Sequence, residues 1–197
     1  MIDSDKYKIM SQDELNSSFL NACDDNNLEL VSFLLTSSEL KLHANIHYRD
    51  EMGLFCAINQ ENLQIIKYLL SSPDLKEHSD IHYKNDFSLQ NSCYFGNLEI
   101  IKFLLSAPEL KEHANFFANE GHFFKLCCEA QDLRILHYLI FDYNLEKTTS
   151  IEKYLNAYPS ANFFNEVRNM FKTRDLKCDL EDKLDTQNNP EKKKIKI

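Results

Sequence analysis

Apolar residues recur along the chain at the spacing of one face of an α-helix. In residues 28–35 they follow the i, i+3, i+4, i+7 spacing of an amphipathic helix, and residues 63–70 repeat it. Pro73 and Pro108 each follow such a stretch, and proline is disfavoured inside a helix because it lacks the amide hydrogen. The pattern therefore predicts helices that end before these prolines.

The predicted helix belongs to a unit that repeats along the chain. The segment Asn27–Val31 has counterparts that start at residues 62, 97 and 132, so each step is 35 residues. Ser72–His78 and Ala107–His113 are close copies of each other, and Ser37–His43 is a looser copy. A fixed period of this kind is the signature of a repeat array.

Each unit also contains a short apolar stretch upstream of that helix, which we expect to form the first helix of the unit. The polar residues between units, such as 78–87 and 113–122, are expected to form an extended loop or hairpin. Units of helix, helix and long loop bury their apolar faces only against each other, as in an α-solenoid. The predicted first helices lie in Phe19–Cys23, Leu54–Ile58, Leu89–Cys93 and Phe124–Cys128.

The third unit resembles an ankyrin repeat. Residues Gly96–Leu105 are similar to the second half of the family pattern, and Leu54 and Leu89 match its first half. Met52-Gly53 and Phe87-Ser88 stand where the family has Thr-Pro. The resemblance implies an all-α, ankyrin-like α-solenoid of helix-helix-loop repeats, in the style of microbial or viral arrays. The alternative is a tetratricopeptide-like solenoid, whose period is one residue shorter but whose characteristic Trp is missing from this chain.

The repeats and the chain ends suggest a domain organisation. Four ankyrin-like repeats are expected over residues 11–145, at about 11–51, 52–86, 87–121 and 122–145. Ser11 and Glu14 have the spacing of a capping box, which predicts the start of the first helix. The other segments are expected to be a flexible N-terminus (1–10), divergent C-terminal capping helices (146–174) and a disordered charged tail (175–197).

Composition narrows the chemistry that the repeats can support. With 22 Lys and Arg against 31 Asp and Glu, the formal net charge is −9, so nucleic acids and anionic lipid surfaces would repel the chain. Three glycines leave no Gly-rich phosphate cradle, and no apolar run reaches the ~18 residues of a membrane helix. Six cysteines without a CxxC pair suggest free thiols in a reducing compartment.

We therefore expect no cofactor, no nucleic acid and no membrane as a partner. We expect a monomer that is cytoplasmic, or delivered into a host cytoplasm without a classical signal peptide.

Two histidine pairs are candidates for a metal site. His43 with His47, and His78 with His82, have the four-residue spacing that would present two imidazoles on one helix face. No carboxylate or cysteine recurs with them at ligand spacing, so we expect no metal. Lys192–Lys196 could be an import signal, but we interpret it as a solvated terminus.

A pair of cysteines is the candidate for nucleophilic chemistry. Cys127 and Cys128 lie near His122, which could serve as a base. Since Cys23, Cys93 and Cys128 occupy the same place in their units, a buried core role is expected instead.

No catalytic constellation stands apart from the repeats, so we expect a protein-interaction module and no enzyme. The alternatives are a non-catalytic domain of, or regulator for, an enzyme complex, and a thiol-dependent enzyme. The resemblance implies a protein partner in a concave groove, lined by the loop tip before each first helix and the exposed end of that helix. It also allows a host-directed effector or inhibitor. The predicted protein-binding residues are Tyr48, Arg49, Glu51, Asn59, Tyr83, Lys84, Asp86, Tyr94, Phe95, Asn119 and Glu129.

Overall fold

The computed structural model describes residues 2–118, 122–157 and 162–188. Every regular element in this part of the chain is a helix, so the all-α prediction is confirmed. The chain divides into two units, Met1–Ala130 and Gln131–Ile197. Among the described residues, no helix combines the length and the apolarity needed to cross a bilayer.

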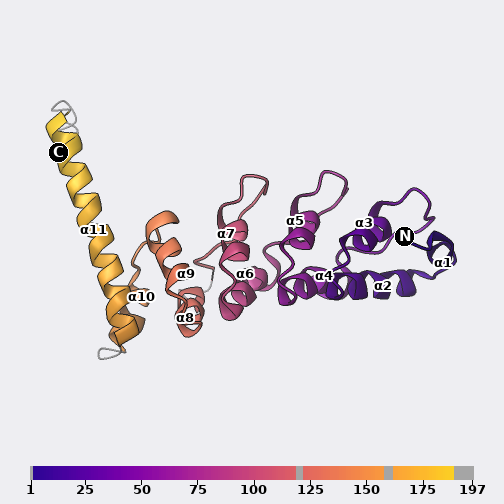
Figure 1. The fold of residues 1–197 in the computed structure, drawn as a ribbon, viewed down its shortest axis with the longest axis horizontal. Coiled ribbons are helices and arrows are strands. Elements are labelled where there is room, and N and C mark those ends of the chain that lie inside the picture. Colours follow the sequence, from indigo (N-terminus) through magenta and orange to yellow (C-terminus); the bar gives the residue numbers. More distant parts are fainter. Residues whose placement is uncertain (1, 119–121, 158–161, 189–197) are drawn as a thin grey trace. The chain divides into compact units, whose positions relative to one another are not determined.

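In the first unit the helices after α1 (Ser4–Lys8) alternate between two rows (Figure 1). Helices adjacent in the first row pack on each other, and α2, α4 and α6 each also pack on the second-row helix that follows in sequence. This is the predicted stack of helix-helix-loop units. The first row consists of α2 (Gln12–Asp24), α4 (Tyr48–Asn59), α6 (Tyr83–Phe95) and α8 (His122–Glu129), and the second of α3 (Leu28–Thr36), α5 (Leu63–Ser71) and α7 (Leu98–Ser106).

The apolar stripe of each helix forms the core between the rows. Ile65, Ile66 and Leu69 of α5 are fully buried, as are Phe19 of α2 and Leu54 of α4. Burying one such side chain contributes about 1.5–3 kcal/mol. Because neighbouring repeats supply much of the covering surface, the stack stabilises units that would be marginal alone.

Each second-row helix begins at an asparagine cap. The Oδ1 atoms of Asn27 and Asn97 accept hydrogen bonds from the amide three residues later, at 3.0 and 3.1 Å. The Oδ1 of Asn62 accepts bonds from the amides of Gln64 and Ile65, both at 3.0 Å. A cap of this kind satisfies an amide that has no partner inside the helix. α5 and α7 end before Pro73 and Pro108, as predicted. The recurring Asn in the sequence is therefore a helix start.

A histidine closes the loop of each repeat. The Nε2 atoms of His43, His78 and His113 each lie 2.9 Å from the carbonyl oxygen of the residue six positions earlier. The chain then returns to the second-row helix, for example through the amide of Ala44, which donates to the carbonyl of Leu34 at 2.9 Å. Residues 37–43, 72–78 and 107–113 therefore form compact, closed turns, whereas residues 83–87 of the predicted loop 78–87 belong to α6.

The second unit has a different helix arrangement. α9 (Leu133–His137) continues into η1 (Tyr138–Asp142), a π-helical turn, and is followed by α10 (Thr149–Asn156) and α11 (Asn162–Asn188). α11 packs on α9 and η1 and buries Val167 and Phe171. The Arg174 guanidinium donates to the carbonyl of Leu145, which ties α11 to the segment after η1.

Three segments differ from the sequence-based expectation. α1 lies within the predicted flexible N-terminus, where the ring of Tyr7 packs edge-on against Phe33 with centroids 5.8 Å apart. Residues 175–188, predicted to be disordered, continue α11, because residues 162–188 contain no Gly or Pro and Lys177 pairs with Glu181 at 3.9 Å. Residues 189–197 lie outside the described part. The fourth predicted repeat, 122–145, is divided between the two units after Ala130.

Candidate protein-binding face

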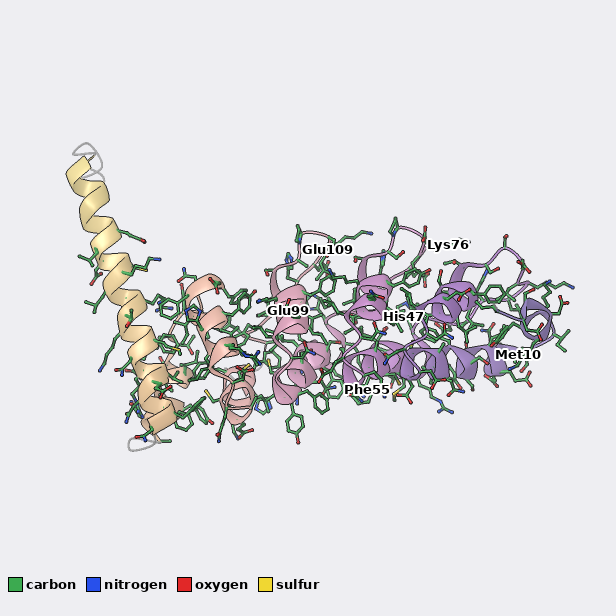
Figure 2. The ribbon with its side chains drawn as sticks, viewed as in Figure 1. Met10, His47, Phe55, Lys76, Glu99 and Glu109 are labelled. Atoms are coloured by element: carbon green, nitrogen blue, oxygen red, sulfur yellow. The ribbon has the colours of Figure 1, made fainter. Side chains whose placement is uncertain are left out.

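The first-row helices leave one side of the stack in contact with solvent, which we call the first-row face. Its residues recur every 35 positions, so successive helices contribute from equivalent places. Figure 2 shows Phe55 at this side of the stack, opposite Lys76 and Glu109 of the loops. The face consists of the exposed and half-buried residues Ser17, Leu20, Asp24, Asp25, Met52, Phe55, Asn59, Gln60, Phe87, Gln90, Tyr94, Phe95, Lys125 and Glu129.

Aromatic side chains gather at the centre of this face. The rings of Phe55 on α4 and Phe87 on α6 are stacked, with centroids 5.5 Å apart and an interplanar angle of 21°. Tyr94 and Phe95, at the end of α6, are 62% and 49% exposed, and their rings meet edge to face at 5.3 Å. Large apolar side chains that stay in water at adjacent positions are typical of an interaction surface.

The charge of the face changes along the row. α2 contains no Lys or Arg, and the carboxylates of Asp24 and Asp25 at its end are exposed. Asp24 Oδ1 accepts a hydrogen bond from Gln60 Nε2 at 2.9 Å, which links the ends of α2 and α4. The exposed cations Arg49 and Lys84 stand at the start of α4 and α6. The face is therefore acidic at α2 and mixed over α4 and α6.

A left-handed turn precedes the right-handed part of α4 and of α6. Residues 49–51 and 84–86 have φ between 48° and 61°, a conformation that costs an L-residue roughly 1–2 kcal/mol. Arg49 and Lys84 in these turns lie over the preceding rings, 5.3 Å from the Tyr48 centroid and 5.0 Å from the Tyr83 centroid. The hydrogen bond to Tyr83 raises the pKa of the Lys84 ammonium. These four predicted site residues form two equivalent cation–aromatic pairs at the edge of the face.

Glu51 and Asp86, predicted to face a partner, are buried: only 6% and 2% of their surfaces are exposed. Each carboxyl pairs with Nδ1 of the histidine four residues earlier, Glu51 with His47 and Asp86 with His82, the latter at 2.7 Å. Asp86 Oδ1 also accepts a hydrogen bond from the amide of Asn115 at 3.1 Å. The left-handed turns place both carboxyls inside the stack, so neither carboxyl is exposed on the first-row face.

The remaining predicted residues lie on the surface of the first-row helices or outside the described part of the chain. Asn59, Tyr94 and Glu129 are exposed at equivalent positions of α4, α6 and α8. Glu129 pairs with Lys125 at 3.6 Å on the surface of α8. Asn119 lies outside the described residues.

The comparison with known families agrees with this geometry. A family model of ankyrin repeats, in three copies, matches residues 19–114. Residues 19–114 are ankyrin repeats. Ankyrin repeats are generally protein–protein interaction modules, and the family is typically non-catalytic. Neither a curated protein nor a solved structure matches the chain.

The histidines of these ankyrin repeats have separate partners within the stack. His43 and His78 bond to carbonyls of their own loops, whereas His47 and His82 pair with buried carboxyls. The two members of each four-residue pair therefore do not act together. Within the described ranges, no group of three or more His, Cys, Asp or Glu could hold a metal ion.

The cysteine pair of α8 sits in the core of the first unit. Cys127 and Cys128 are buried, and this burial raises the pKa of both thiols. A hydrogen bond with Cys93 of the preceding repeat raises the pKa of Cys127 further. Because the thiolate is the nucleophilic form, a raised pKa opposes a role for this pair as a nucleophile.

The sequence interpretation did not include Phe55 and Phe87 in the face. Phe55 fell within the predicted apolar helix, and Phe87 fell in a predicted loop. In α4 the buried side chains with helical spacing include Leu54, Ala57 and Ile58, whereas Phe55 is only half-buried. The helical spacing of these apolar residues was the signal that could have identified it.

Proposed function

We propose that this ankyrin-repeat chain binds a protein partner through the first-row face. The observation that carries the proposal is the exposed aromatic pair Tyr94 and Phe95 on α6, the helix that also contributes Phe87 to the stack with Phe55 of α4. Aromatic residues and arginine supply most of the binding energy in protein interfaces. The proposed contact residues are Tyr48, Arg49, Phe55, Asn59, Tyr83, Lys84, Phe87, Tyr94, Phe95 and Glu129.

The variation between repeats also supports the proposal. Core positions keep one type of residue, as with Phe19, Leu54 and Leu89. The exposed position at the end of each first-row helix instead changes from Asp24 to Asn59, Tyr94 and Glu129. A surface adapted to one partner needs different side chains at equivalent positions, whereas the core needs the same ones.

Affinity capture followed by mass spectrometry tests this proposal. The wild-type chain is compared with the double variant Tyr94→Ala/Phe95→Ala and with Leu42→Ala as a control. Leu42 is also half exposed, but it lies in a loop between the rows of the first two repeats. The double variant should lose the partner, by more than about 2 kcal/mol of binding free energy if both residues are hot spots.

The control variant should retain the partner. Equal recovery by the double variant and the wild type would place the binding surface elsewhere on the chain.

The identity of the captured protein would separate the finer roles. A protein from another organism would indicate a host-directed effector or inhibitor, and a subunit of an enzyme complex would indicate a regulator. The raised thiol pKa values of Cys127 and Cys128 support a non-catalytic module. The six free cysteines support a reducing, cytoplasmic setting, and we propose a monomer, which light scattering would test.

A further inference from the structure

A pocket of 360 Å³ lies between α4 and α6 on the first-row face. Its apolar part is formed by Met52, Ile58 and the stacked rings of Phe55 and Phe87, and its rim by the left-handed turns. This volume is at the small end of the roughly 300–1,000 Å³ of ligand pockets. It suits one large side chain rather than a cofactor.

Glu51 lines the pocket and has a carboxylate oxygen without a hydrogen-bond partner. Its Oε1 pairs with His47, while its buried Oε2 has no hydrogen-bond partner. At the equivalent position of the next repeat, the Oδ1 of Asp86 accepts from both His82 and the amide of Asn115. A buried acceptor without a partner carries an uncompensated desolvation cost. A hydrogen bond from a ligand donor to this oxygen would remove that cost and so favour binding.

The charges around the pocket favour an uncharged group. The lining contains two cationic residues, Arg49 and Lys84, and two acidic ones, Asp50 and Glu51, so it carries no formal net charge. A charged head group would lose its hydration there without a surplus counter-charge. An aromatic ring with its own donor satisfies each requirement, since it packs against the stacked pair of Phe55 and Phe87 and carries an N–H or O–H for the free acceptor of Glu51.

The charges on α2, beside the pocket, favour particular residue types next to the bound aromatic residue of the partner. On the α2 side, the exposed side chains of Asp13, Asp24 and Asp25 are acidic and α2 has no basic residue. Residues of a partner that lie over α2 are therefore favoured when basic. Building on the proposed function, we infer that the pocket between α4 and α6 receives a Trp or Tyr side chain of a protein partner whose flanking residues over α2 are Lys or Arg.

Selection from a phage-displayed library of random peptides against the full chain tests this inference. The recovered peptides should be enriched in Trp or Tyr beside Lys or Arg. Their affinity should fall about tenfold with Glu51→Gln, because the amide replaces the free acceptor with a donor. Asp86→Asn, the matched change in the next repeat, should leave affinity unchanged because Asp86 does not line the pocket.

A fluorescence measurement reports the pocket directly. The chain contains no Trp, so the emission of a peptide Trp reports only on its own surroundings. The emission should shift to the blue on binding to the wild type, and the shift should shrink with Phe55→Leu, whose folding is verified by circular dichroism. Recovered peptides without an aromatic donor, failure to recover any peptide with the folded chain, or equal affinity for Glu51→Gln would overturn the inference.

These outcomes are separable from those of the proposed function. Partner affinity that is unchanged by Glu51→Gln but lost with Tyr94→Ala/Phe95→Ala would keep the first-row face and reject the pocket. Capture that survives both variants would reject the proposed function itself.

Discussion

Asn26, Glu61 and Gly96 hold the same left-handed backbone position, one residue before the caps of α3, α5 and α7, with φ of 58°, 54° and 75°. Only glycine adopts this conformation without strain. We predict that Glu61→Gly raises the free energy of unfolding by about 0.5–1 kcal/mol, after allowance for the greater freedom of glycine in the unfolded chain. Urea denaturation measures the change. Gly96→Ala is the reciprocal control and should lower the same quantity by about 1 kcal/mol.

The ring of Phe19, in the preceding repeat, packs directly against Gly53. A Cβ at this position would lie 2.4 Å from Cζ of Phe19, which is fully buried and cannot move aside. Gly53→Ala should therefore lower the free energy of unfolding by about 1–3 kcal/mol, although alanine is the better helix former. Thermal melts measure the change in stability for Gly53→Ala and for Ser88→Ala, the matched variant at the equivalent position of α6. A stabilised Gly53→Ala protein would contradict the packing described here.

The cysteines should differ in reactivity according to their burial. Cys23, Cys127 and Cys128 are buried, and that burial raises the pKa of each thiol, whereas Cys178 is exposed on α11. With a thiol reagent, Cys178 should react first, and the three buried thiols should react only after denaturant is added. Raising the pH through the usual thiol range should leave the three buried thiols slow, because their pKa values are raised. Rapid modification of all six cysteines in the folded chain would show that the core assignment is wrong.

Among the elements, the second-row helices follow most directly from the sequence. Asn62 marks the start of α5 and Pro73 follows its end, and both signals act through local backbone hydrogen bonding. The starts of α4 and α6 could not be predicted in this way. Three consecutive left-handed residues, such as Arg49 to Glu51, oppose the local preferences of their side chains and persist only because the surrounding stack holds them.

The same difference explains the errors at the site. The aromatic residues at the end of α6 were accessible to prediction, because exposure at a helix end follows from helical spacing. The burial of Glu51 and Asp86 was not, since it depends on their pairing with His47 and His82 across a left-handed turn. A helix-based interpretation treated these carboxyls as exposed, whereas the structure buries them.

The helix α11 contains two parts of unequal importance for folding. Phe171 is buried and Arg174 bonds to the carbonyl of Leu145, whereas residues 175–181 are exposed. Truncation after Asp175 should shift the melting temperature little, even though it removes residues that are helical. Truncation after Met170 removes the buried ring and the Arg174 contact and should lower the melting temperature clearly, as measured by circular dichroism. Equal effects of the two truncations would mean that the exposed segment also contributes to stability.

For the whole molecule, the repeat period predicts which deletions are tolerated. Deleting residues 52–86 removes one unit of 35 residues and joins Glu51 to Phe87, which preserves the order of turn and helix because Glu51 and Asp86 are equivalent. The shortened chain should stay helical and melt at a lower temperature, since one set of interfaces is lost. Deleting residues 52–79 instead leaves part of a loop before α6, and this variant should not fold cooperatively. An unfolded product from the in-register deletion would argue against a modular stack.

The parallel order of α2, α4 and α6 also sets a spacing for anything that crosses them. Equivalent positions on packed neighbouring helices are separated by roughly 8–10 Å. A polypeptide in the polyproline II conformation advances roughly 3.1 Å per residue with three residues per turn, so its side chains at i and i+3 point the same way. A partner in this conformation, laid across the row, would thus meet one helix with about every third residue, and its side chains at the intervening positions would point away from the helices. The partner's contact residues would therefore be spaced three positions apart. A basic residue over α2 would stand three positions from the residue whose side chain reaches α4.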